Sequence, residues 1–459
     1  MKEKITSWAA ELKPARLLPC IYYITTVISF IIFFLKLRHG GIAEEITVEK
    51  KVVRYKTTEL DEDFRRKLQG YFDFREARSF PNCESLIKED TGELERVQQL
   101  KTSTKIDSLS FPNGAISTFI QETSCQEYFK IRNYPNLNSP QRTDFPLAYS
   151  MVVHKNPGQV ERLLRAIYSS ENVYCIHIDA KSPYDVYSDL EELASCFPNV
   201  FLAGKRESVL WGSYERFQAD LNCMEELLEH QIQWRYLINV CGEDFPLKTN
   251  SEIVDHLRSI YPQNSITSET MPKKKLKRYQ RHWRIKRNFF REYKFIPKPT
   301  IWRKSPPPID IEIYAGSAYN MVTREFVNWM TKDEEVKELI EWSRDAFSPD
   351  EFIWASIAWM ERAPGHEFQM KNSTNEFSRL ILWTNAKSPP HHCQGYTRRG
   401  VCVFGSGDLA WVTNRPHMFA NKFDDHDDFA IQCLEEELRR RTNDHEDQLK
   451  LEKKTSDIV

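Results

Sequence analysis

The stretch LAYSMVV at residues 147–153 is a continuous apolar run of strand length, and the segments around it follow an alternating pattern. Apolar residues next recur at helical spacing from Val160 to Ile167. The alternation continues with predicted strands at 173–179, 199–203 and 235–240 and a predicted helix at 213–230. Strands that alternate with helices predict an α/β fold with a mostly parallel sheet.

Ligands of such sheets bind beyond the carboxyl ends of the strands. Asp179 ends the second predicted strand, and Cys241-Gly242-Glu243-Asp244 follows the strand at 235–240. These positions are therefore candidates for a site. The alternative for Asp179 is a structural one, in which its carboxylate caps a helix or a turn.

A second apolar stretch, residues 17–35, contains 19 residues without a charge and could span a bilayer as a helix. The flanking lysine and arginine residues favour a cytosolic N-terminus. A cleaved signal peptide is the alternative, but its apolar core would normally be shorter and end in small residues, whereas Phe33-Phe34-Leu35-Lys36 closes this one. We therefore expect a type II anchor, with everything beyond it luminal or extracellular.

The rest of the chain divides by composition. Residues 1–16 would be a cytosolic tail, and the charged, irregular residues 36–120 would form a stem that holds a domain off the membrane. The alternating pattern places one α/β domain at 121–438. Residues 439–459 are strongly charged and are expected to be a frayed tail.

Charge and composition limit the partners. The formal net charge of −2 gives no global field that would attract nucleic acid. One dense basic run with interleaved aromatic residues occupies 273–291 and could be a heparin- or RNA-binding patch. A luminal protein meets no nucleic acid, so we favour a solvated helix face and keep contact with a sulfated or otherwise anionic acceptor as the alternative.

Cysteine usage fits an oxidising compartment. Of 10 cysteines, Cys20 lies in the apolar span, and an odd number remains, so at least one thiol is left over if the others pair. Zinc is not favoured, because no CxxC pair occurs and His391-His392-Cys393 has no spaced partner set. Asn372 begins the only N-glycosylation acceptor, Asn-Ser-Thr.

The segment Ser348-Pro349-Asp350-Glu351 permits two interpretations. Serine at the cap, proline at the first helical position and glutamate three residues after the serine are typical of a capping box. Alternatively, Glu351 is a carboxylate at a helix start that faces a site and takes a proton from a hydroxyl. The spacing alone does not choose between them.

Glycines at 400, 405 and 407, with Arg399 before them and Lys422 after them, could approach a diphosphate, which needs positive charge nearby. Acidic pairs that could hold a divalent metal occur at Asp61/Asp63 and Asp425/Asp427. Neither pair follows a predicted strand, so we expect a metal-independent site.

Several ordered motifs together resemble the luminal β-1,6-N-acetylglucosaminyltransferases that build core-2 O-glycan and I-antigen branches. The resemblance runs from about residue 120 to 435. The matching stretches are AYSMVVHK (148–155), ERLLRAIY (161–168), YCIHIDAKS (174–182), QADLNC (218–223), YLINVCGEDFPLKTN (236–250), GSAY (316–319), SPDEFIWA (348–355), CVFGSGDL (402–409) and ANKFD (420–424).

The resemblance implies a GT-A-like fold in the Golgi lumen, UDP-GlcNAc as donor, inversion at the anomeric carbon and no metal or other cofactor. Glu351 would be the general base that deprotonates the acceptor's 6-hydroxyl. Arg399 and Lys422 would stabilise the departing diphosphate, and Asp179 would bind the uridine or ribose. Expected partners are the donor, a glycan on a glycoprotein or glycolipid, and the membrane; a homodimer is among the expected assemblies.

The resemblance also implies a cysteine pattern. It pairs Cys83 with Cys433, Cys125 with Cys196, Cys175 with Cys223 and Cys393 with Cys402. Cys241 would remain free beside the site.

Departures from the core-2 members concentrate in the acceptor pocket. Lys275, Arg278 and the stacking Trp383 match, but Thr267 stands where those members carry a second acceptor-binding glutamate, and Asn385 replaces a tyrosine. Trp211 likewise replaces a tyrosine near the nucleotide. The acceptor is then a galactose- or GalNAc-containing glycan other than core 1, or core 1 is used weakly.

Two alternatives differ in class. A related transferase with another donor, such as a xylosyltransferase, would share the fold, although such enzymes are usually much larger. A luminal glycan- or nucleotide-binding protein would keep the fold with little turnover. The presence of Glu351, Arg399 and Lys422 argues against the binding protein, and Thr267 and Asn385 argue weakly for it.

Overall fold

The computed structural model describes residues 81–103, 112–134, 144–287, 295–368 and 377–456. The chain divides into two compact units, Met1–Leu60 and Asp61–Val459, and all described residues belong to the second. The predicted cytosolic tail and anchor, Asp61/Asp63 and the glycosylation acceptor at Asn372 lie outside the described residues. Within those ranges, no helix combines the length and the apolar character needed to cross a bilayer.

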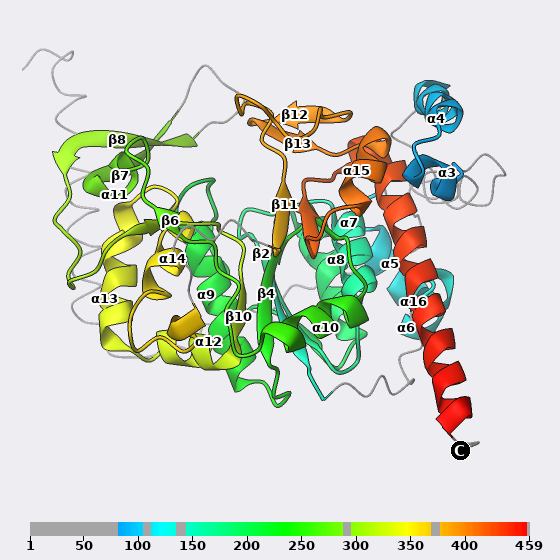
Figure 1. Ribbon diagram of the computed structural model, residues 1–459, viewed down its shortest axis with the longest axis horizontal. Helices are drawn as coiled ribbons and strands as arrows, with labels where there is room; N and C mark the ends of the chain where they lie inside the picture. The colour runs from blue at the N-terminus through cyan, green and yellow to red at the C-terminus, as the bar shows by residue number, and fades with distance from the viewer. Residues whose placement is uncertain (1–80, 104–111, 135–143, 288–294, 369–376, 457–459) are drawn as a thin grey trace, which may run out of the picture. The chain divides into compact units, whose positions relative to one another are not determined.

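A five-stranded sheet with the order β10-β4-β1-β2-β3 lies at the centre of the described unit (Figure 1). Strands β1 to β4 are mutually parallel, and only the edge strand β10 runs antiparallel. The prediction of a mostly parallel sheet is therefore confirmed. The strands are β1 (Leu147–Val153), β2 (Val173–Ile178), β3 (Val200–Leu202), β4 (Tyr236–Cys241) and β10 (Met321–Thr323).

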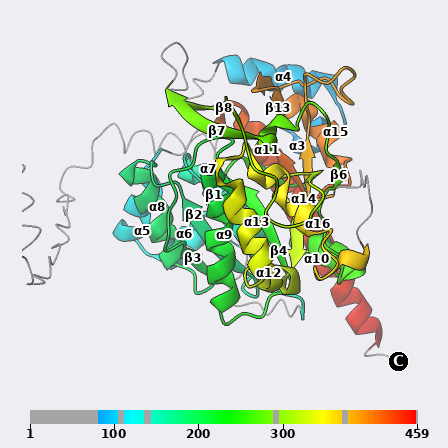
Figure 2. The same ribbon diagram turned by 90° about the vertical axis from the view of Figure 1, so that its left-hand side faces the viewer.

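Helices cover both faces of this sheet, which explains why β1 is apolar throughout rather than alternating. Tyr149 and Met151 of β1 face a core shared with α7 and α8, whereas Ala148 faces a second core shared with α9, α12 and α14. Figure 2 shows α9, α12 and α13 in front of the sheet. The covering helices are α5 (Ala115–Glu122), α6 (Cys125–Ile131), α7 (Pro157–Ile167), α8 (Tyr184–Ser195), α9 (Tyr214–Glu229), α12 (Arg324–Met330), α13 (Glu334–Trp342) and α14 (Ile353–Ile357).

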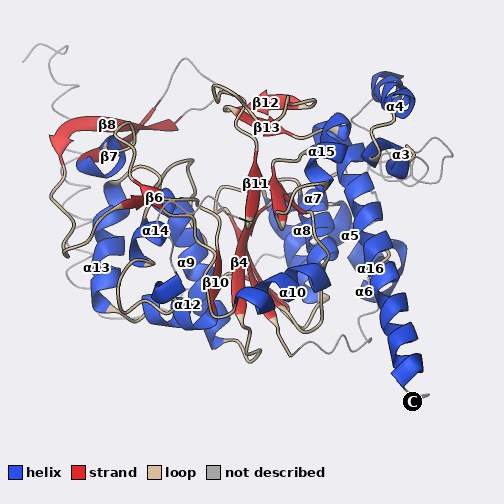
Figure 3. Ribbon diagram, in the orientation of Figure 1, coloured by secondary structure: helices blue, strands red, loops and turns tan. Residues whose placement is uncertain are grey.

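Smaller sheets and helices complete the unit (Figure 3). One three-stranded sheet contains β5 (Asp244–Pro246), β11 (Arg379–Ile381) and β14 (Phe419–Asn421). The two-stranded pairs are β6 (Glu269–Thr270) with β9 (Tyr314–Ala315), β7 (Arg281–Arg287) with β8 (Phe295–Arg303), and β12 (Tyr396–Arg398) with β13 (Val401–Val403). The helices are α10 (Asn250–Ile260), α11 (Lys277–Gln280) and α15 (Leu409–Thr413), with short 3-10 turns at Ser343–Asp345, Pro349–Glu351, His366–Phe368, Ser406–Asp408 and Asp425–Asp427.

The basic run at 273–291 is not the helix face that we favoured. Only four of its residues form helix α11, and the next seven form strand β7, which pairs with β8. Trp283 and Ile285 alternate with cations at the two-residue period of a strand. The pairing partner lies further along the chain, so the charge pattern alone does not reveal it.

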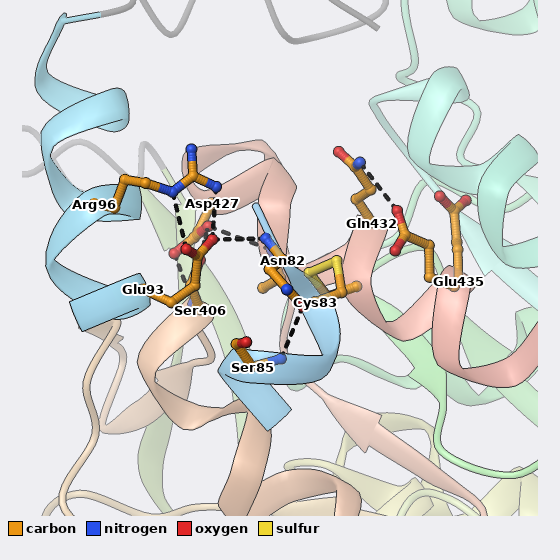
Figure 4. The surroundings of a disulfide bond; sticks show 12 residues. Asn82, Cys83, Ser85, Glu93, Arg96, Ser406, Asp427, Gln432 and Glu435 are labelled. Atoms are coloured by element: carbon orange, nitrogen blue, oxygen red, sulfur yellow. Dashed lines mark hydrogen bonds and ion pairs between the residues drawn. A yellow bond between two sulfur atoms is a disulfide. The ribbon is translucent and has the colours of Figure 1, made fainter. Parts of the chain in front are cut away.

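Helices from the two ends of the described chain are joined. Residues 83–103, which we assigned to the stem, form α3 (Cys83–Ile87) and α4 (Thr91–Ser103), and Cys83 bonds to Cys433 of α16 (Asp428–Ser456). Figure 4 shows this disulfide and the nearby ion pair between Arg96 and Glu93. Leu86 and Val97 are buried in the same core cluster as Leu434. Helix α16 continues to Ser456, where the sequence favoured a frayed end.

Candidate active site

Glu351 lies at the end of the 3-10 turn that leads into α14. Ser348 makes no side-chain capping bond, so the capping-box interpretation is wrong. Only a backbone bond of 3.0 Å, from Glu351 N to Ser348 O, links the two residues. The Glu351 carboxylate instead forms an ion pair with the guanidinium of Arg278 on α11, and 32% of the Glu351 side chain stays accessible to solvent. A carboxylate that is partly accessible and held by an arginine can still accept a proton from a bound hydroxyl.

Arg278 and Trp211 both contact one aromatic ring, that of Phe347. The guanidinium of Arg278 lies 5.4 Å from the centroid of the Phe347 ring, and the Trp211 ring meets the same ring edge-on at 5.4 Å. Gly212 makes this packing possible, because a Cβ at that position would approach Phe347 Cε2 to 2.4 Å. Phe347 therefore couples the proposed base region to Trp211.

Arg399 lies at the tip of the β12–β13 hairpin. Its guanidinium is 5.5 Å from the centroid of the Trp211 ring, which is 60% exposed. Trp383, itself 50% exposed, forms an isolated bridge with Val401 of the same hairpin. The arrangement brings one predicted acceptor residue next to two predicted donor residues.

Lys422 belongs to a cluster of three cations around Glu243. The Glu243 carboxylate lies 3.0 Å from Lys155 Nζ, 2.7 Å from Arg398 Nη2 and 3.3 Å from Lys422 Nζ. Burial alone would raise the pKa of Glu243, but the charges of Lys422, Lys155 and Arg398 lower it to about 2. Arg398 also pairs with Asp424 at 3.2 Å, so the three cations share two carboxylates and one positive charge remains to attract a further anion.

Asp179 follows β2 and is held in a turn. Its Oδ1 accepts hydrogen bonds from Lys181 N at 2.8 Å and from Lys181 Nζ at 2.9 Å. Lys181 Nζ also donates to Val209 O at 2.6 Å, two residues before Trp211. The structural role that we considered for Asp179 is therefore present, and the same turn supports the loop that carries Trp211.

Thr267 and Lys275 flank strand β6, which pairs with β9. The residue after β9, Gly316, is bonded to the backbone of Glu351. The carbonyl of Thr267 packs so closely on Gly316 that a Cβ there would lie 2.4 Å away, and Gly316 N donates to Glu351 O at 2.9 Å. The Thr267 hydroxyl is buried and has no hydrogen-bond partner among the described residues. Lys275 Nζ lies 3.3 Å from Glu269 Oε1, an exposed carboxylate that we did not predict.

The cysteine arrangement is the one that the resemblance implied. Disulfides join Cys83 to Cys433, Cys125 to Cys196, Cys175 to Cys223 and Cys393 to Cys402, and Cys241 is free. The Cys241 sulfur lies 3.5 Å from Tyr319 Oη and 3.4 Å from Asn421 Nδ2. Burial raises the pKa of this thiol to about 11, so it stays protonated at neutral pH.

The candidate metal ligands have other partners. Asp427 accepts from Lys101 Nζ at 2.6 Å and from Ser406 Oγ at 2.7 Å. In the part of the chain that the structure describes, Cys393, Cys402 and Asp408 are the one group with metal-ligand spacing. The two sulfurs of that group are bonded to each other.

Sequence reasoning identified the residues at the strand ends but missed those that connect them. Phe347 and Arg398 had no signal of their own, since an aromatic residue or a cation in a loop is common. Glu243 lay in the segment that strand topology singled out, but its three cationic partners come from positions 155, 398 and 422. Only tertiary structure assembles that cluster.

Comparisons with known proteins agree on one family. A family model described as "Core-2/I-Branching enzyme" matches residues 147–413. The chain is 38% identical over 366 residues to a beta-1,3-galactosyl-O-glycosyl-glycoprotein beta-1,6-N-acetylglucosaminyltransferase 4 from Danio rerio, covering 78% of this chain and 84% of that protein. It is also 38% identical over 376 residues to a beta-1,3-galactosyl-O-glycosyl-glycoprotein beta-1,6-N-acetylglucosaminyltransferase from Homo sapiens, covering 78% of this chain and 85% of that protein.

Proposed function

Since the chain belongs to the Core-2/I-branching enzyme family and is a glycosyltransferase, we propose that it transfers GlcNAc from UDP-GlcNAc in β-1,6 linkage to a galactose- or GalNAc-containing glycan. The reaction inverts the anomeric carbon and needs no metal. The domain has a GT-A-like fold, to which the parallel central sheet is suited. The outcome is a branch on an O-glycan.

Glu351 is the general base in this proposal. A carboxylate oxygen of Glu351 removes the proton of the acceptor's 6-hydroxyl. As the proton leaves, the hydroxyl oxygen of the acceptor attacks C1 of the donor sugar. The bond from C1 to the diphosphate breaks on the opposite face, and UDP leaves. The ion pair with Arg278 supports this role, because it fixes the orientation of the carboxylate.

Arg399 and Lys422 stabilise the charge that develops on the departing diphosphate. Their surroundings support the assignment: Arg399 lies at the tip of a hairpin beside Trp211, and Lys422 lies in a cluster with more cations than carboxylates. When the diphosphate is bound, Lys422 can turn from Glu243 to a phosphate oxygen, and Glu243 keeps Lys155 and Arg398 as partners. Positive charge from side chains then does what a metal ion does in other transferases.

Asp179 and Trp211 bind the nucleoside part of the donor. Asp179 lies at the carboxyl end of β2, where ligands of parallel sheets bind. Trp211 offers an exposed ring for stacking. Their link through Lys181 and the carbonyl of Val209 supports one continuous donor subsite.

Lys275, Arg278, Thr267 and Trp383 border the acceptor in this proposal. Thr267 supplies no carboxylate, and losing a charged hydrogen bond to a sugar hydroxyl costs about 1.5–3 kcal/mol. Glu269, which is exposed beside Lys275, could hold a hydroxyl from a different position. We therefore propose an acceptor other than core 1, or weak use of core 1, and efficient transfer to core 1 by the unmodified protein would refute this point.

The protein works in the Golgi lumen as a type II membrane protein in this proposal. Four disulfides support an oxidising compartment. The apolar stretch at 17–35 would be the anchor, Asn372 would carry a glycan, and a homodimer is compatible with such an enzyme.

The observation that carries the proposal is the connected set Glu351, Arg278, Phe347, Trp211 and Arg399 in a chain of this family. The test is transfer of label from UDP-GlcNAc to neutral core-1, core-3 and poly-N-acetyllactosamine acceptors, with EDTA present and the linkage of the product determined. Label in a β-1,6 branch supports the proposal. Binding of UDP without transfer to any acceptor would favour a binding protein, and transfer only from another donor, such as UDP-xylose, would favour a related transferase.

A further inference from the structure

The β7–β8 hairpin begins directly beside the proposed base. Trp283 of β7 stacks on Phe347 with ring centroids 4.4 Å apart, and Phe347 also contacts Arg278, the partner of Glu351. At the same end of the hairpin, directly after β8, Lys304 N donates to Gln280 O of α11 at 3.0 Å. The hairpin is thus fixed at its base to the helix that carries Arg278.

Six exposed side chains, distributed over both faces of the two paired strands, form what we call the hairpin surface. Arg284, Lys298 and Arg303 supply exposed positive charge. Ile285, Ile301 and Trp302 supply apolar area and are 44%, 79% and 66% exposed. Most large apolar side chains of the described unit are buried. Exposed apolar side chains grouped with basic ones beside the proposed active site are therefore typical of a ligand-binding surface.

The pairing register places like charges opposite each other. Arg284 faces Lys298, and Arg281 faces Arg303. Like charges directly opposite in an antiparallel pair repel and destabilise the pairing. None of Arg284, Lys298 and Arg303 has an ion pair with another described residue, whereas Lys304 at the hairpin's base pairs with Asp345.

The sequence of this region is strongly basic. Between positions 273 and 304 the sequence contains fourteen lysine and arginine residues and a single acidic residue, Glu292. Three of these cations, Lys275, Arg278 and Lys304, are paired with carboxylates outside the run. Among the described residues, Arg284, Lys298 and Arg303 are therefore open to an anionic ligand.

We propose that the hairpin surface binds the acidic part of an acceptor glycan, so that the enzyme prefers sialylated or sulfated acceptors to neutral ones. This inference rests on the proposed function and specifies its acceptor class. The cations bind carboxylate or sulfate groups, and the exposed ring of Trp302 offers a face for the apolar side of a sugar. The chain of contacts from Trp283 through Phe347 and Arg278 to Glu351 favours an acceptor over an unrelated polyanion, because it links the hairpin to the proposed base.

The test compares one neutral acceptor with its sulfated counterpart at low and high salt. The triple variant Arg284→Gln, Lys298→Gln, Arg303→Gln is measured beside the matched variant Lys88→Gln, Lys130→Gln, Lys332→Gln, which removes three exposed lysines outside the hairpin. In the wild-type protein we expect kcat/KM to favour the sulfated acceptor, mainly through KM, and to lose this preference as salt rises. The hairpin variant should lower the ratio of the two kcat/KM values about tenfold, and the control variant should leave the ratio as it is.

An unchanged ratio in a hairpin variant that melts at the wild-type temperature would overturn the inference. If neither acceptor is glycosylated, the proposed function fails, and the inference is then tested by titrating the sulfated glycan itself: equal affinity for wild-type protein and hairpin variant contradicts it, and selective loss of affinity supports it. Hairpin-dependent binding to phosphatidylserine vesicles with an unchanged acceptor ratio would assign the surface to a membrane instead.

Discussion

Asp350 and Glu351 are neighbouring carboxylates in different environments. Asp350 is buried, whereas Glu351 is partly exposed and paired with Arg278. Burial and, to a smaller extent, the charge of Glu351 together raise the pKa of Asp350 to about 7, although the charge of Arg216 lowers it. Asp350 therefore holds its proton more tightly than an exposed carboxyl does, and Glu351 is the residue that is accessible to an acceptor.

The raised pKa of Asp350 predicts a pH effect on stability. The folded state holds this proton more tightly than the unfolded state, so the contribution is fully present below pH 3.8 and is lost as the pH rises through about 7. Asp350→Asn should therefore show a smaller fall in the free energy of unfolding between pH 4 and pH 7 than the wild-type protein. Denaturant unfolding at both pH values measures this, with the exposed Asp310→Asn as control. An equal fall in the free energy of unfolding between pH 4 and pH 7 for Asp350→Asn and the wild-type protein would contradict the raised pKa of Asp350.

Arg399 allows a matched test of diphosphate stabilisation. Arg399→Ala should lower kcat by about 10²–10³-fold, because it removes a charge that acts mainly on the departing group. Arg415→Ala is the control, since Arg415 also lies over a tryptophan, Trp411, at 4.8 Å but is not part of the site. Steady-state kinetics with UDP-GlcNAc measure both variants. A similar small effect of the two substitutions would remove Arg399 from the mechanism.

At the scale of elements, local sequence patterns predicted what local forces determine. The strands at β1, β2, β3 and β4 and helices α7 and α9 lie where apolar runs and helical spacing indicated. The β7–β8 pair was missed, because its register depends on pairing with a segment further along the chain. The ion pair of Glu351 with Arg278 was missed for the same reason, since 73 residues separate its members and the capping-box pattern gave a local explanation.

The turn before α9 positions Trp211, and Gly212 controls that turn. Gly212 has φ +74°, and an added Cβ would overlap Phe347, whereas Gly114 has φ +84° with nothing within 4 Å of its added Cβ. Both substitutions to alanine carry the backbone cost of a positive φ, about 1 kcal/mol. Only Gly212→Ala should also displace Phe347 and Trp211 and raise the KM for UDP-GlcNAc. Thermal melting and donor kinetics of the two variants separate these effects; matching kinetics for both would contradict the role of this turn.

At the scale of the molecule, covalent links tie distant parts of the described chain together. The Cys83–Cys433 bond closes a separation of 350 residues, and Cys393–Cys402 closes one of 9. In the chain-entropy account, a disulfide across a longer loop stabilises more. These two segments of the described chain meet because α3 and α16 share a core, which no local pattern indicated.

Replacing both cysteines of each pair by serine tests this link. Loss of the Cys83–Cys433 bond should lower the free energy of unfolding by about 2–5 kcal/mol, and loss of the Cys393–Cys402 bond should lower it less. Limited proteolysis should also cut the Cys83/Cys433 variant faster around α3 and α4. Equal losses of stability, with α3 still protected, would show that packing rather than the disulfide holds these helices.

The central claim is that this chain transfers GlcNAc with Glu351 as the base. The most direct measurement is the rate of label transfer from UDP-GlcNAc to acceptor by wild-type protein and Glu351→Gln, with the exposed Glu361→Gln as control and UDP affinity measured for all three. We predict that Glu351→Gln binds UDP as the wild type does and transfers label about 10²–10⁴-fold more slowly, and that Glu361→Gln matches the wild type. Transfer by Glu351→Gln at the wild-type rate would contradict the account.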